Sequence, residues 1–124
     1  MDTARQFERV AREWSAATGS PVWEPENDFS VEVDGRDIGL VYDAESDPDF
    51  INVYCDLGPP GFEGVHARML RASADPRGGT YSLSPNTGNV FYRMRLPLCD
   101  ELNGADLPHL LGEIAASGAA RLVD

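Results

Sequence analysis

A hairpin pattern between residues 29 and 42 limits the possible folds more than any other part of the sequence. Apolar and polar residues alternate strictly in Phe29-Ser30-Val31-Glu32-Val33, the period of a strand with one buried face. Asp34-Gly35 follows, a dipeptide that favours a tight two-residue turn, and residues 38–42 supply a second apolar run. The chain must therefore build an antiparallel sheet, because such a short turn joins only antiparallel neighbours.

Three more strands are predicted further along the chain. Residues 51–57 follow an acidic loop at 43–49 and extend the hairpin into an antiparallel meander. Residues 80–83 and 89–96 flank a Ser84-Pro85-Asn86-Thr87-Gly88 turn, which predicts a second hairpin.

Helical spacing of apolar residues predicts three helices, over residues 2–18, 62–73 and 106–122. The last helix contains Gly112 and Gly118. Each weakens a helix by about 1 kcal/mol relative to Ala, so we expect this helix to pack loosely. The residues that the second helix should turn inward are Val65, Met69 and Leu70, with Phe62.

The element order is α-βββ-α-ββ-α, without an internal repeat, and 124 residues suffice for one domain over 1–124. We expect a two-layer α+β fold in which the helices cover one face of an antiparallel sheet. Trp23, in the connector after the first helix, is expected to pack against this domain.

Strand alternation assigns the residues of the sheet to two faces. The expected helix-covered face comprises Val31, Val33, Ile38, Leu40, Ile51, Val53, Cys55, Val90, Tyr92, Met94 and Leu96. The opposite face carries Val41, Tyr54 and Phe91 beside Glu32, Asn52, Arg93 and Arg95. Such a mixture is typical of a surface that contacts another chain, although single exposed apolar residues are also common without a partner.

The charge balance argues against several partners. Twenty-one acidic residues face ten basic ones, all arginines, which gives a net charge of -11. Such a surface repels phosphate backbones and anionic lipids, so neither nucleic acid nor a membrane is an expected partner. The sequence has no apolar run of spanning length and no signal peptide at its start, which predicts a cytoplasmic protein.

No residue pattern predicts an active site. The chain has no glycine-rich phosphate loop. His66 and His109 are too far apart to form a metal motif, so no metal or cofactor is expected. Cys55 and Cys99 are expected to be reduced thiols. A Cys55–His66 nucleophile pair stays open, but no sequence feature marks either residue as activated.

The acidic loop at residues 43–49 lacks the pattern of a calcium loop and is expected to be a solvated hairpin loop. We therefore expect no enzyme, although a small-molecule enzyme with a pocket stays an alternative.

Several strings in this order resemble the class I type III secretion chaperones, the Tir chaperone or CesT-type family. They are residues 29–36, Tyr42-Asp43, Val53-Tyr-Cys-Asp-Leu-Gly58, residues 79–88 and Arg95-Leu-Pro-Leu98. The likeness covers nearly the whole chain. It departs from the family in the second helix, which reaches Pro76 sooner than in many members.

The resemblance implies a bacterial homodimer that binds an extended N-terminal segment of a type III secreted effector and keeps it soluble and secretion-competent. Its expected effector-binding residues are Phe7, Val10, Trp14, Val41 and Tyr54. Phe91 and Arg93 are expected in the dimer interface. Trp14 stays open between a client contact and a core residue, and a binding or regulatory adaptor without a secreted client is the alternative function.

Overall fold

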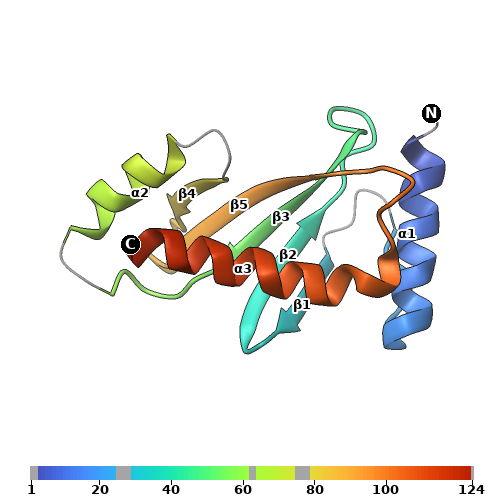
Figure 1. Cartoon of the computed structure of the whole chain (residues 1–124), viewed down its shortest axis with the longest axis horizontal. Coiled ribbons are helices and arrows are strands. Elements are labelled where there is room, and N and C mark those ends of the chain that lie inside the picture. Colours follow the sequence, from blue (N-terminus) through green and yellow to red (C-terminus); the bar gives the residue numbers. More distant parts are fainter. Residues whose placement is uncertain (1–2, 25–28, 62–63, 75–78, 124) are drawn as a thin grey trace.

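The computed structural model describes residues 3–24, 29–61, 64–74 and 79–123 of the chain. Its elements follow the predicted order (Figure 1). They are α1 (Thr3–Thr18), β1 (Phe29–Val33), β2 (Arg36–Val41), β3 (Phe50–Asp56), α2 (Val65–Ser73), β4 (Thr80–Leu83), β5 (Val90–Pro97), a short 3-10 helix η1 (Gly104–Asp106) and α3 (Leu107–Val123). The predicted starts of the first two helices, Asp2 and Phe62, lie outside the described residues.

The five strands form one antiparallel sheet in the order β1-β2-β3-β5-β4. Asp34 and Gly35 make the first turn with positive φ angles of 52° and 78°, the conformation that a tight hairpin turn demands, and Val33 pairs with Arg36 across it. The second hairpin joins the meander through β5, which pairs with β3, so that β1 and β4 are the two edges.

All three helices lie on the predicted face of the sheet. Figure 1 shows α3 crossing this face, with α1 at one end and α2 at the other beside β4. The strand residues Ile38, Leu40, Ile51, Val53, Cys55, Val90, Tyr92 and Leu96 are buried there, each at most 9% exposed. The two-layer α+β fold with helices on one face is therefore confirmed.

Two details of the helices correct the sequence-based expectations. Gly118 is buried against Tyr92, and a Cβ at this glycine would lie 2.5 Å from the Tyr92 ring. Gly112 is buried beside Val33 in the same way, so the two glycines allow close packing of α3 where a loose contact was expected. Leu70 does not face inward: it is 76% exposed, because α2 buries only the stripe of Val65 and Met69.

Aromatic rings fix α1 to its end of the sheet. The Phe7 ring stacks on Tyr42, with 4.1 Å between the centroids, and meets Trp23 edge to face at 4.7 Å. Trp23 is 4% exposed, which confirms that the connector packs against the domain, and its ring stacks on Phe29 at 5.8 Å. The connector therefore links α1 and the start of β1 through a continuous aromatic layer.

Candidate functional site

Three predicted effector-binding residues of α1 lie in the core of the chain. Phe7, Val10 and Trp14 are 1%, 0% and 4% exposed. Their spacing places them on one face of α1, and this is the face that the helix buries against the domain. The structure therefore buries all three side chains, Trp14 included, and their role in effector binding stays a prediction. Phe7 differs from the other two because its ring also lines a surface groove.

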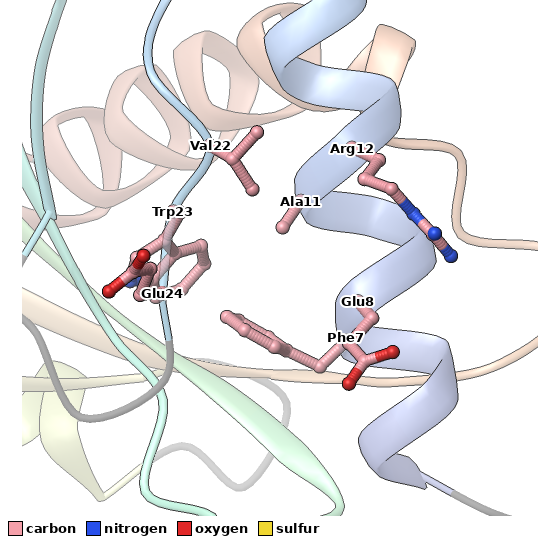
Figure 2. A pocket seen from close by; sticks show the side chains of 7 residues that line it. All are labelled: Phe7, Glu8, Ala11, Arg12, Val22, Trp23 and Glu24. Carbon is pink, nitrogen blue, oxygen red and sulfur yellow. The ribbon is translucent and has the colours of Figure 1, made fainter.

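This groove runs between α1 and the connector at residues 21–24 (Figure 2). Its cavity has a volume of about 200 Å³. Figure 2 shows Phe7 and Ala11 pointing toward the connector and Val22 pointing back toward α1. The residues that line it are Phe7, Glu8, Ala11, Arg12, Val22, Trp23 and Glu24, and we call this the α1 groove.

The α1 groove has an apolar floor and a charged rim. Phe7 and Trp23 form the floor, and Val22 is 52% exposed, so one apolar wall is open to solvent. Glu8 and Glu24 lie on opposite sides of the opening, and both are exposed. A groove of this size and chemistry accommodates one large apolar side chain of a partner. Sequence reasoning missed Val22, although an apolar residue next to Trp23 in a polar connector was a usable signal.

The other four predicted residues lie together on the sheet face that no described helix covers. Val41, Tyr54, Phe91 and Arg93 are on β2, β3 and β5, and Tyr54 pairs directly with Arg93. The Arg93 guanidinium lies 5.5 Å from the centre of the Tyr54 ring, and it donates a hydrogen bond of 3.0 Å to Asn52 Oδ1. The structure thus joins the predicted dimer residues with Val41 and Tyr54, and it separates all of them from α1.

Asp47 ties the acidic loop to this uncovered face. It forms a salt bridge of 2.5 Å with Arg95 and accepts a hydrogen bond of 3.1 Å from Asn52 Nδ2. The hydrogen bond from Arg95 lowers the pKa of Asp47. Asn52 is only 5% exposed, so a buried amide on this face is satisfied by two charged neighbours. The loop is therefore anchored to the sheet at Asp47.

The two edges of the sheet are not equivalent. At β4, the backbone N–H of Tyr81 donates a hydrogen bond of 2.9 Å to Ser73 Oγ at the end of α2. At β1, within residues 29–33 of the described structure, backbone hydrogen bonds run only to β2. An open edge offers a row of backbone donors and acceptors to an incoming strand, so β1 is the edge suited to pairing.

The residues considered for catalysis are not arranged for it. Burial raises the pKa of the Cys55 thiol to about 11, which disfavours the reactive thiolate, and His66 is exposed on α2. In the part of the chain that the structure describes, no three His, Cys, Asp or Glu side chains gather as a metal site. None of the described helices is long and apolar enough to cross a membrane.

Comparisons with known proteins give matches only at the level of structure. The sequence matches no protein-family model and no curated protein. One similar solved structure is the complex of the Yersinia pestis type III secretion chaperone SycH with a stable fragment of YscM2. The two chains have a TM-score of 0.62 and 12% sequence identity, and the match covers 92% of this chain and 98% of that chain. A chain of the ExsC-ExsE complex has a TM-score of 0.74 at 16% sequence identity, and the match covers 99% of this chain and 96% of that chain.

A third similar structure is the HopA1-SchA chaperone-effector complex, with a TM-score of 0.65 and 12% identity over 100% of this chain and 99% of that chain. The chain therefore has the fold of the type III secretion chaperones, as the resemblance predicted.

Proposed function

We propose that this protein is a non-enzymatic chaperone that binds an extended N-terminal segment of a type III secreted effector and keeps it soluble and secretion-competent. The α1 groove beside the open β1 edge carries this proposal. The fold supports it, because the similar solved structures include a chaperone-effector complex. The chaperone needs no cofactor or metal, binds neither nucleic acid nor membrane, and works in the bacterial cytoplasm.

The proposed binding mode combines strand pairing with an apolar anchor. Phe29 begins β1 and stacks on Trp23 in the floor of the α1 groove, so the open edge starts beside the groove. A segment that pairs with β1 obtains affinity from backbone hydrogen bonds and specificity from side chains that enter pockets. One of its apolar side chains would occupy the space between Val22 and Ala11.

The charge of the chain suits this role. A net charge of -11 keeps the complex soluble by self-repulsion, even while the groove binds an apolar segment. The exposed carboxylates of Glu8 and Glu24 flank the opening. They would speed the encounter with a segment that carries basic residues next to its apolar anchor.

The proposal includes a homodimer that uses the uncovered sheet face. Tyr54, Phe91 and Arg93 lie on this face, and Phe91 is half-buried without a described helix over it. In a two-fold dimer each of these residues would occur on both sides of the contact, which makes the interface self-complementary.

The decisive experiment is direct binding to N-terminal segments of secreted proteins from the same organism. Each segment is produced with a solubility tag, mixed with the chaperone and assayed by calorimetry, and segment solubility is measured by sedimentation after the tag is cleaved. We expect at least one segment to bind and to stay in the supernatant only with the chaperone. The proposal fails if no segment binds. Binding only to a folded protein that is not secreted would favour the adaptor function.

A further inference from the structure

The segment 99–104 is bound to α1 by side-chain hydrogen bonds. Arg9 Nη2 donates a hydrogen bond of 3.1 Å to the carbonyl of Cys99, and Arg9 Nη1 forms a salt bridge of 2.7 Å with Glu13. The same Glu13 carboxylate oxygen accepts a hydrogen bond of 3.0 Å from the backbone N–H of Gly104. Gln6 Nε2 donates to Asp100 Oδ1 one turn earlier. We call Arg9, Glu13, Gly104 and the Cys99 carbonyl the α1 clamp.

Gly104 brings the clamp into contact with the backbone of α1. A Cβ at this position would lie 2.1 Å from the carbonyl oxygen of Val10 and 2.8 Å from the amide nitrogen of Trp14. Gly104 has no positive φ, so its need for glycine comes from this approach and not from its conformation. Any larger residue must push α1 and η1 apart by roughly 1 Å to restore van der Waals contact.

The clamp side chains Arg9 and Glu13 and the α1 groove lie on different sides of one helix. At 100° per residue, the mean direction of the clamp residues Arg9 and Glu13 is about 150° from that of the groove residues Phe7, Glu8, Ala11 and Arg12. η1 continues directly into α3, which packs across the sheet. A push from Gly104 on the backbone of Val10 and Trp14 therefore displaces α1 relative to the connector that carries Val22.

We infer that Arg9, Glu13 and Gly104 are positioning residues that set the width of the α1 groove, and thereby the size of the apolar anchor that it accepts. The identity of the ligand in this inference rests on the proposed function. The effect of the three residues on the width of the groove does not. The clamp holds α1 at the distance that leaves a cavity of about 200 Å³ between Ala11 and Val22. The repulsion between atoms rises steeply at short distances. A shift of α1 that is smaller than one side chain therefore changes which apolar side chains fit into the groove.

The test compares Gly104→Ala with Gly39→Ala, a control in β2 whose added Cβ would meet nothing closer than 4.0 Å. Nuclear Overhauser cross-peaks between the methyl groups of Ala11 and Val22 report the groove width without any ligand. Short Gly/Ser peptides with one central Ala, Leu or Phe then serve as probes, titrated against the indole N–H signal of Trp23. A further variant, Arg9→Met, removes two clamp bonds while keeping a side chain of similar length.

We expect Gly104→Ala to change the intensity of the methyl cross-peaks and to change the ratio of Phe-peptide to Leu-peptide affinity by at least about threefold. Arg9→Met removes a bond that holds α1 to the 99–104 segment, so it should change the cross-peaks and the ratio in the same direction as Gly104→Ala, and Gly39→Ala should change neither. Unchanged cross-peaks in folded Gly104→Ala would refute the positioning role, whatever the peptides do. If Gly104→Ala does not fold, an unchanged Arg9→Met refutes it instead. If wild type binds no peptide, the groove function and its size selection both fail, independently of the cross-peaks.

Discussion

The side chain of Trp23 lies edge to face against Phe7, with 4.7 Å between the ring centroids and 76° between the ring planes. One ring comes from α1 and the other from the connector, so this contact forms the floor of the α1 groove and also joins two segments of the core. The groove thus depends on residues that the fold itself needs. Mutations that probe binding should therefore be placed at its exposed wall.

Val22→Asp should weaken binding of an effector segment by about tenfold or more, because it places a charge in the apolar wall of the groove. Val22 is 52% exposed, so the urea midpoint should stay close to that of wild type. Calorimetry with a segment that binds wild type measures the affinity. Leu70→Asp, another exposed apolar position, is the matched control. Equal affinities for wild type and Val22→Asp would exclude the groove as the contact.

Trp14→Ala should lower the free energy of unfolding by about 3–5 kcal/mol, because it leaves a cavity under α1. Trp14 is 4% exposed and packs edge to face on Phe29 at 6.0 Å. Urea unfolding measures the loss, with Ala16→Gly on the exposed side of α1 as a control that should cost about 1 kcal/mol. Affinity should fall only in proportion to the unfolded fraction. A fully stable Trp14→Ala protein with lost binding would return Trp14 to the client surface.

Phe91→Asp should convert a dimer into a monomer, since a two-fold axis doubles the effect of one substitution. Light scattering coupled to size exclusion at micromolar concentration gives the mass, and wild type should have about twice the chain mass of 13.5 kDa. Leu70→Asp should remain dimeric. Dissociation by Leu70→Asp alone would move the interface from the uncovered sheet face to α2, and a monomeric wild type would remove the dimer from the proposal.

The Asp47–Arg95 salt bridge should make stability depend on acid pH. The hydrogen bond from Arg95 lowers the pKa of Asp47 from its ordinary value of 3.8, so the stabilisation is present above that value. It is lost as the pH falls through the lower pKa of the folded state. Urea unfolding at neutral pH and at pH values below 3.8 should show a smaller loss for Asp47→Asn than for wild type. Glu45→Gln in the same loop is the charge-matched control, and identical profiles for wild type and Asp47→Asn would contradict the expectation.

The elements with local signals could be predicted from the amino-acid sequence alone. Strict alternation and the Asp34-Gly35 turn predicted the first hairpin, and the register places Val33 opposite Arg36 as that turn requires. The apolar period also predicted the order α-βββ-α-ββ-α and the inward face of the strands. These features depend on neighbours within a few residues, where steric and hydrophobic preferences are strong.

The contacts of each apolar face become visible only in the folded chain. Periodicity places Phe7, Val10 and Trp14 on one side of α1, but it does not say whether the sheet or a partner covers that side. Leu70 follows the helical period as well as Met69 does, and it is nevertheless exposed because α2 packs against β4 and α3 over a narrow stripe. The fit of Gly104 against the backbone of α1 joins segments about ninety residues apart, as does the Gly104–Glu13 hydrogen bond. Such contacts depend on how whole elements pack in three dimensions, and no local pattern in the sequence encodes them.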